Sequence, residues 1–153
     1  MPNYREFDDT RYFFDLRKLA QEKGVTVDSL IETIDISVES GNYKLGVQLC
    51  EDGWDKDYST KPTEILVSKG ADIVFNLSAS PFTKGKASKR DRVFSEQAQS
   101  LGCTVVYVNQ VGVQNNGKTF YVFDGDSSVW SANGERHHFG TFFEEGGFLW
   151  DSN

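Results

Sequence analysis

Apolar residues near the start of the chain recur with a helical period. Residues 9–23 are predicted to form a helix that stops at Gly24, as helices often do at glycine. Its apolar stripe consists of Tyr12, Phe13, Leu16, Leu19 and Ala20. Residues 25–42 fit either a short helix or a strand, and Ser40, Gly41 and Asn42 form a turn pattern.

From Tyr43 onward, short apolar runs alternate with helical patterns. The longer helix, from about Ala87, has an apolar face of Val93, Phe94, Ala98 and Leu101. This alternation is typical of a parallel α/β sheet. The predicted strands are 43–49, 72–77 and 104–110, and the predicted helices are 62–69, before Gly70, and 87–101, before Gly102.

The pattern changes after residue 110. Short strands are expected at 119–125, 127–132 and 135–140, and Asn133-Gly134 is a strong hairpin signal. The fold class is therefore α/β, with a mixed sheet that has a more antiparallel end.

Composition narrows the function classes. The 153 residues suit one domain, and a net charge of −7 disfavours nucleic acid as a partner. No apolar run approaches the roughly 20 residues of a membrane span, and the N-terminal segment lacks the pattern of a secretory signal. Cys50 and Cys103 do not make a disulfide framework. We therefore expect a cytoplasmic protein with free thiols that binds neither nucleic acid nor membrane.

Cys50 is the candidate nucleophile, because a predicted strand ends there and a turn-rich loop begins. Ligands bind outside the carboxyl ends of strands in α/β sheets, and the amide that follows such a turn can bind an oxyanion. The alternative is a small buried thiol, as most free cysteines are. Glu51 and Asp52 would raise the pKa of the thiol. His137 and His138 point to opposite faces of a late strand, so spacing suggests no base for Cys50.

Other polar and aromatic groups have structural interpretations. Cys103 precedes an apolar strand and is expected in the core. The Asp124-Gly125-Asp126 run fits a turn, and with His137 and His138 it lacks the ligand spacing of a known metal site. A basic cluster fits a helix start and one helix face; it comprises Lys84, Lys86, Lys89, Arg90 and Arg92. A C-terminal aromatic cluster would suit docking on further polypeptide or a second subunit; it comprises Phe139, Phe142, Phe143, Phe148 and Trp150.

Several motifs in order carry a family resemblance. GVQLCEDGW, which contains Cys50, resembles the nucleophile segment of the nitrilase (carbon-nitrogen hydrolase) superfamily. The glutaminase domain of glutamine-dependent NAD synthetases is closely similar to the run GADIVFNLSASPFTKGKASKRDRVF, then VVYVNQVG and FDGDS, and to the opening MPNYREFDDTRYF. The likeness extends from Met1 to about Gly134, apart from residues 20–42. It implies one partial domain over residues 1–153, a portion of an αββα sandwich with helices packed on one face.

The resemblance implies a Glu-Lys-Cys triad in which Cys50 attacks a carboxamide. In the family, the glutamate and the lysine precede the segment that begins at Met1, so this chain is expected to be inactive alone. Asp9 stands where the family has a second glutamate that hydrogen-bonds the lysine, and it is one methylene shorter. The Glu51 amide would join the oxyanion hole, while its carboxylate would meet the α-amino group of glutamine.

The remaining matched positions concern the substrate. Tyr4 matches an aromatic residue of the glutamine pocket, and Trp54 a structural position beside the nucleophile loop. Ser80 and Lys86 match loop positions that bind the α-amino and α-carboxylate ends of the substrate, with Lys rather than Arg as the cation, and Lys is the less directional partner for a carboxylate.

The leading hypothesis is hydrolysis of glutamine through a thioester, which supplies ammonia for NAD synthesis from deamido-NAD. No cofactor is expected in this chain, because ATP and deamido-NAD would bind to a C-terminal synthetase domain that it lacks. Besides glutamine and the synthetase domain, the expected partners are the N-terminal segment and further copies of the chain in a homo-oligomer. Two alternatives are a different amidase, carbamoylase or nitrilase of the superfamily, and a non-catalytic fragment or interaction module.

Overall fold

A computed structural model describes residues 13–115, 117–139 and 141–151. The helices in these residues are α1 (Leu16–Lys23), α2 (Pro62–Ser68) and α3 (Lys86–Leu101), with short 3-10 turns at Asp28–Leu30, Cys50–Gly53 and Asp55–Asp57. The strands are β1 (Ile34–Val38), β2 (Gly41–Leu49), β3 (Ile73–Ser78), β4 (Thr104–Asn109), β5 (Val111–Asn115), β6 (Phe120–Asp124), β7 (Ser128–Trp130) and β8 (Arg136–His138).

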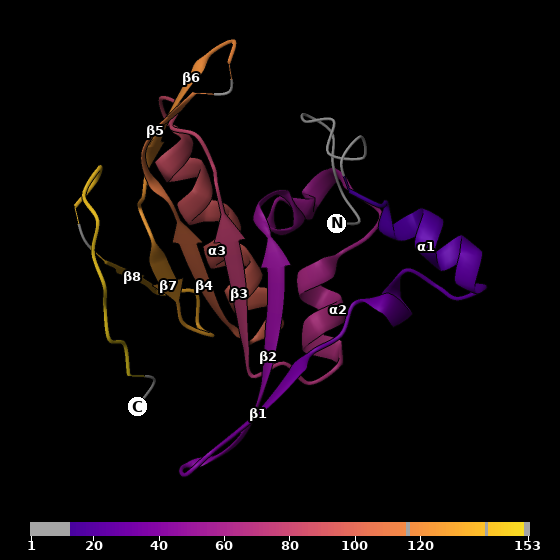
Figure 1. Cartoon of the computed structure of the whole chain (residues 1–153). Coiled ribbons are helices and arrows are strands. Elements are labelled where there is room, and N and C mark those ends of the chain that lie inside the picture. Colours follow the sequence, from indigo (N-terminus) through magenta and orange to yellow (C-terminus); the bar gives the residue numbers. More distant parts are fainter. Residues whose placement is uncertain (1–12, 116, 140, 152–153) are drawn as a thin grey trace.

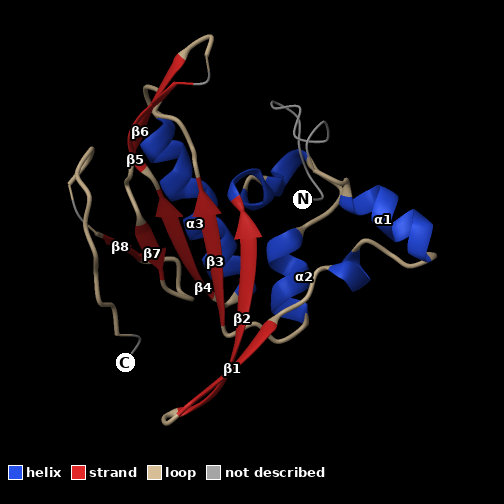
Figure 2. Ribbon diagram, in the orientation of Figure 1, coloured by secondary structure: helices blue, strands red, loops and turns tan. Residues whose placement is uncertain are grey.

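Six of the strands form one mixed sheet in the order β1-β2-β3-β4-β7-β8 (Figure 2). The central strands β2, β3 and β4 are parallel, and helices α2 and α3 provide the two crossovers between them. Strands β1, β7 and β8 pair antiparallel at the two edges. The predicted α/β class and the predicted antiparallel end are confirmed.

Helices α2 and α3 cover the same face of this sheet (Figure 1). Beneath α3, Phe94 packs with Tyr107 of β4 and Trp130 of β7, and all three are fully buried. Beneath α2, Leu66 and Val74 form a second cluster with Cys103, which is 4% exposed. The predicted core position of Cys103 and the predicted apolar face of α3 are both confirmed.

The opposite face of the sheet is also apolar. Val47, Leu49, Leu77 and Val108 point to this side and are 38–45% exposed. Apolar side chains on both faces are the pattern of strands that are buried between two layers. The described residues therefore form one helix layer and one sheet layer, which is half of an αββα sandwich.

The first helix is shorter than predicted. Residues 13–15 are not helical, because the Asp15 carboxylate caps α1 by accepting a hydrogen bond from the amide of Arg17 at 2.8 Å. Phe13, which was placed on the apolar stripe, is 69% exposed. Gly24 ends the helix as predicted, in the left-handed conformation with φ 65°. Residues 9–12 lie outside the described part of the chain.

Two strands were not predicted as such. The ambiguous segment 25–42 contains β1, which pairs with β2 across a turn at Glu39 and Ser40. Strand β5 follows β4 after a single residue and pairs with β6 in a separate two-stranded hairpin, so β6 does not extend the main sheet. Figure 1 shows this hairpin projecting from the rest of the molecule.

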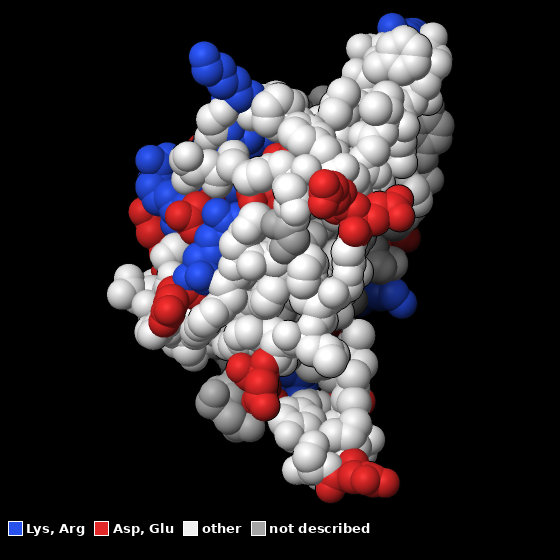
Figure 3. All heavy atoms as spheres, turned by 90° about the vertical axis from the view of Figure 1, so that its left-hand side faces the viewer, with Lys and Arg blue, Asp and Glu red and all other residues white. Residues whose placement is uncertain are grey.

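The C-terminal segment passes along the edge formed by β8 (Figure 1). Its aromatic rings pack mainly on one another and on β8, and the Phe139 and Phe148 rings stack with centroids 4.9 Å apart. Phe142, Phe143 and Phe148 remain 41–49% exposed. Figure 3 shows that most of the surface on this side is uncharged. Among the described helices, none has the length and apolarity to cross a bilayer.

Candidate active site

Cys50 lies at the carboxyl end of β2, where the strand gives way to the 3-10 turn Cys50–Gly53. Its φ of 43° is unusual for a residue with a side chain and marks a sharp change of chain direction. Strand β2 pairs in parallel with β3, so the carboxyl ends of both strands lie at the same edge of the sheet. The half-buried thiol thus occupies the position at which α/β sheets bind ligands.

The turn is fixed by neighbours from three elements. The Leu49 amide donates to the Asp52 carboxylate at 3.2 Å, and the Asn76 side-chain amide of β3 donates to the Cys50 carbonyl at 3.2 Å. At Gly53, a β-carbon would lie 2.2 Å from Asn76 Nδ2 and 2.8 Å from a ring atom of Phe94. Only glycine fits there, which makes Gly53 a structural determinant of the turn that the sequence analysis missed.

The surroundings of Cys50 hold its thiol in the protonated form. Burial raises the pKa of Cys50, and the Glu51 carboxylate raises it further. The Ala79 amide, the Ser78 hydroxyl and the Lys86 ammonium group act in the opposite direction, without overcoming burial. Because the thiolate is the nucleophile, a general base would have to take the proton before Cys50 could attack.

Ser80 and Lys86 belong to the loop and helix start that follow β3. Ser80 is only 2% exposed, and both of its backbone polar groups bond to the Asn109 side chain. Lys86 is the first residue of α3, and its ammonium group donates to the Pro81 carbonyl at 3.1 Å. The structure therefore brings this loop and Lys86 to the same sheet edge as Cys50, although the Ser80 side chain has little access to solvent.

Glu51 and Trp54 flank the turn. The Glu51 carboxylate accepts a hydrogen bond from the Tyr58 hydroxyl at 2.8 Å. The Trp54 and Phe94 rings pack in a T-shaped arrangement with centroids 5.8 Å apart, and the Lys89 ammonium group lies 5.5 Å from the Trp54 centroid. Trp54 thus joins the nucleophile turn to the core.

The other two predicted site residues, Tyr4 and Asp9, lie outside the described residues. A surface hollow of about 230 Å³ is present near the start of α1, but Cys50, Ser80 and Lys86 do not line it. Its walls are formed by Leu16, Leu30, Ile31, Glu32, Val47, Gln48, Leu49, Asp52 and Pro62.

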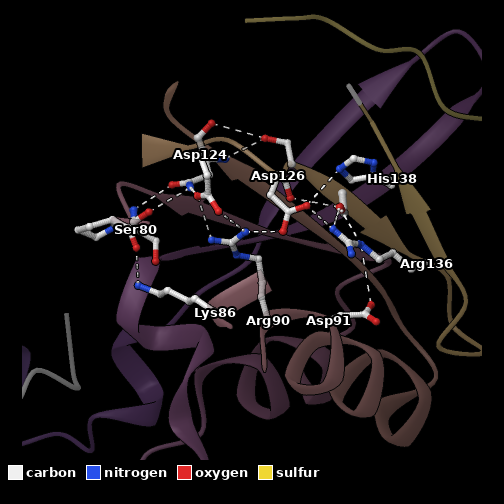
Figure 4. A network of polar contacts seen from close by, with 12 residues as sticks. Ser80, Lys86, Arg90, Asp91, Asp124, Asp126, Arg136 and His138 are labelled. Atoms are coloured by element: carbon white, nitrogen blue, oxygen red, sulfur yellow. Dashed lines mark hydrogen bonds and ion pairs between the residues drawn. The ribbon is translucent and has the colours of Figure 1, made fainter. Parts of the chain in front are cut away.

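A buried ionic network next to this site was not predicted (Figure 4). Arg90 was predicted to belong to a basic cluster at a helix start and on one helix face; it does lie in the first turns of α3, but its side chain is fully buried and binds Asp124 and Asp126. Asp126 also binds Arg136, and it lies 3.1 Å from His138 Nε2. The Asp124-Gly125-Asp126 run, predicted to be a turn, is the end of β6 and the irregular link to β7, with φ 70° at Gly125, and its carboxylates pair with a buried guanidinium.

The available sequence signal for this network was a pair of acidic residues at the end of an apolar strand, Asp124 at its last position and Asp126 just after it. Within the described residues, no three His, Cys, Asp or Glu side chains gather in a way that could hold a metal ion.

Comparison with known proteins places the chain among enzymes that act on carbon–nitrogen bonds. The model of the carbon-nitrogen hydrolase family matches residues 6–148. The glutamine-dependent NAD(+) synthetase of Thermotoga maritima is 36% identical over 146 residues, which are 95% of this chain and 21% of that protein. The chain therefore spans about a fifth of the length of this relative.

Solved structures agree with this placement. A glutamine-dependent NAD+ synthetase from Acinetobacter baumannii, in complex with ADP, superposes with a TM-score of 0.68 at 33% identity, covering 95% of this chain and 23% of that one. A carbon-nitrogen hydrolase from Helicobacter pylori G27 superposes with a TM-score of 0.59 at 28% identity, covering 74% of this chain and 41% of that one.

Proposed function

Because this chain belongs to the carbon-nitrogen hydrolase family, we propose that it contributes the nucleophile, Cys50, to a glutaminase. The observation that carries this proposal is the placement of Cys50. Its thiol lies on a sharp turn at the carboxyl end of a parallel strand, beside the Ser80 loop and Lys86 at the start of α3. The relatives named as glutamine-dependent support glutamine as the substrate.

The proposed reaction has two steps. The Cys50 sulfur attacks the carboxamide carbon of glutamine after a base removes the thiol proton, and the carbon–nitrogen bond breaks as the nitrogen takes up a proton and leaves as ammonia. Water then adds to the thioester, the carbon–sulfur bond breaks, and glutamate leaves with regeneration of the thiol. The Glu51 amide would stabilise the oxyanion in both steps.

The charged ends of glutamine would be recognised by side chains around the turn. We assign the α-amino group to the Glu51 carboxylate, which already accepts a bond from Tyr58, and the α-carboxylate to Lys86. Ser80, in the loop that follows β3, would also bind the α-amino end. Tyr4 and Asp9 complete the proposed site, the first lining the pocket and the second bonding the triad lysine.

We further propose that the base and the lysine of the triad come from polypeptide outside the motifs of this chain. The ammonia would serve NAD synthesis from deamido-NAD, with ATP and deamido-NAD bound outside these residues, and the assembly would be a homo-oligomer. On this proposal the purified chain releases no ammonia from glutamine. Ammonia release by the purified chain that disappears in Cys50→Ala would overturn the proposal that the base and the lysine come from other polypeptide.

A non-catalytic role is the second candidate, because burial keeps the Cys50 thiol protonated. The groups that favour the thiolate are an amide, a hydroxyl and an ammonium group, and none of the three is a base. An interaction module would retain such a thiol without using it.

Alkylation by iodoacetamide, followed by peptide mass spectrometry, separates these possibilities. A glutaminase site predicts that L-glutamine slows the alkylation of Cys50, whereas butyramide, which lacks both charged ends, does not. Cys103, which is 4% exposed, is the matched control thiol and should be insensitive to either amide. Equal protection by both amides would indicate another amidase of the superfamily, and no protection by either would refute the proposal.

A further inference from the structure

The loop after β3 is held at three consecutive residues. Ser80 is bound by Asn109 through both of its backbone groups, and the Lys86 ammonium group binds the Pro81 carbonyl. The Phe82 amide donates to the Val122 carbonyl of β6 at 2.7 Å. This loop begins directly after Ser78 and Ala79, which act on the Cys50 thiol, so it lies beside the nucleophile.

Asn109 makes the most directional of these contacts. Its Oδ1 accepts the Ser80 amide at 2.8 Å, and its Nδ2 donates to the Ser80 carbonyl at 3.2 Å. Two bonds from one planar carboxamide to one residue fix both the distance and the orientation of that residue. Asn109 is itself 7% exposed and ends β4, whose register places it opposite Ser78 of β3.

Asp124 adds a third contact to the Asn109 carboxamide. Asn109 Nδ2 also donates to Asp124 Oδ1 at 3.3 Å. The Ser80 carbonyl and the Asp124 carboxylate thus both accept from the Asn109 nitrogen, which leaves the Asn109 oxygen for the Ser80 amide. Replacing the Asp124 carboxylate would weaken this contact and leave Asn109 held by Ser80 alone.

Arg90 holds Asp124 in place. Its guanidinium group binds Asp124 at 3.3 Å, binds Asp126, and lies 4.8 Å from the centroid of the Tyr107 ring. Arg136, the first residue of β8, pairs with the second carboxylate, that of Asp126 (Figure 4). Two carboxylates thus face two guanidinium groups, and the end of the network nearest the candidate site is Asn109.

We propose that Asn109 is a positioning residue for the candidate glutaminase site. Held by the Arg90–Asp124 pair, it fixes the Ser80 loop in the orientation that receives the amino-acid end of the substrate. The inference rests on the proposed function for the identity of the substrate. The loop geometry can be measured independently of that function.

The first measurement is hydrogen exchange at the Ser80 amide by NMR on the full chain. Removing the acceptor in Asn109→Ala should speed exchange at this amide by roughly tenfold or more. Asp124→Asn keeps the shape of the side chain and should also speed exchange at the Ser80 amide. This second variant provides the test if Asn109→Ala does not fold. Arg136→Gln is the matched control, because it removes a contact with Asp126 and leaves the Asp124–Asn109 bond in place.

The second measurement is the L-glutamine concentration that half-protects Cys50 from iodoacetamide. A positioning role predicts that this concentration rises roughly three- to thirtyfold in Asn109→Ala and Asp124→Asn, with an alkylation rate without glutamine that stays within about twofold. Arg136→Gln should change neither value. A merely structural role would lower stability and leave the half-protecting concentration unchanged, which would overturn the inference.

The two proposals fail in different ways. If L-glutamine does not protect Cys50 in the unaltered chain, the proposed function is wrong, and exchange at the Ser80 amide still decides whether Asn109 holds the loop. If glutamine protects Cys50 but the Ser80 amide exchanges equally slowly in Asn109→Ala, the positioning role is wrong and the proposed function stands.

Discussion

Gly53 offers a direct test of the turn that presents Cys50. In Gly53→Ala the new methyl group would lie 2.2 Å from Asn76 Nδ2 and 2.8 Å from a ring atom of Phe94, distances that require displacement of the Asn76 and Phe94 side chains. Overpacking of this kind destabilises by about 1–3 kcal/mol. Displacement of Asn76 also removes its hydrogen bond to the Cys50 carbonyl, which adds about 1 kcal/mol.

The free energy of unfolding should therefore fall by roughly 2–4 kcal/mol. For a chain of this size, that corresponds to a decrease of roughly 5–15 °C in Tm by circular dichroism. Gly147→Ala is the matched control, because a β-carbon there meets nothing within 4 Å. It should change stability by less than about 0.5 kcal/mol. A Gly53→Ala protein with the Tm of the unaltered chain would refute the close packing of the turn.

Two further predictions concern buried charge and the reactivity of the thiol. Arg90→Met leaves the buried carboxylate of Asp124 without its guanidinium partner, so the free energy of unfolding measured in urea should fall by about 3–5 kcal/mol. The double variant Arg90→Met/Asp124→Asn should recover part of this loss. A loss below about 1 kcal/mol in Arg90→Met would contradict the network. Because burial raises the pKa of Cys50, its alkylation rate should level off at a higher pH than that of a cysteine peptide. At fixed neutral pH, Glu51→Gln should speed alkylation and Lys86→Gln should slow it, each by roughly two- to fivefold, and changes of the opposite sign would disprove the electrostatic account.

The sequence predicted those features that depend on local pattern. The run that ends at Cys50 is apolar and the residues that follow are polar and turn-forming, so the position of the thiol at a strand end could be inferred. The apolar face of α3 has strict helical spacing, and its Phe94 is fully buried as expected. In both cases neighbours in sequence determine the structure.

Features that depend on distant contacts were missed. All five residues of β1 are exposed, so the strand has no alternation of buried and exposed positions that could identify it. Arg90 stands in a run of basic residues and resembles its neighbours until Asp124 and Asp126, more than 30 positions away, are placed against it. Gly53 appeared to be an ordinary turn residue, because its requirement for glycine comes from side chains of β3 and α3.

The central claim is that Cys50 is a nucleophile for the carboxamide carbon of glutamine, and an electrophilic analogue tests it most directly. The chain, together with the polypeptide that supplies the base and the lysine of the triad, would be treated with a glutamine analogue in which a diazoketone replaces the carboxamide, and the modified peptides would be mapped by mass spectrometry. The account predicts a covalent adduct on Cys50, prevented by excess L-glutamine, with Cys103 unmodified. An adduct that forms equally on both thiols, or none on Cys50, would contradict it.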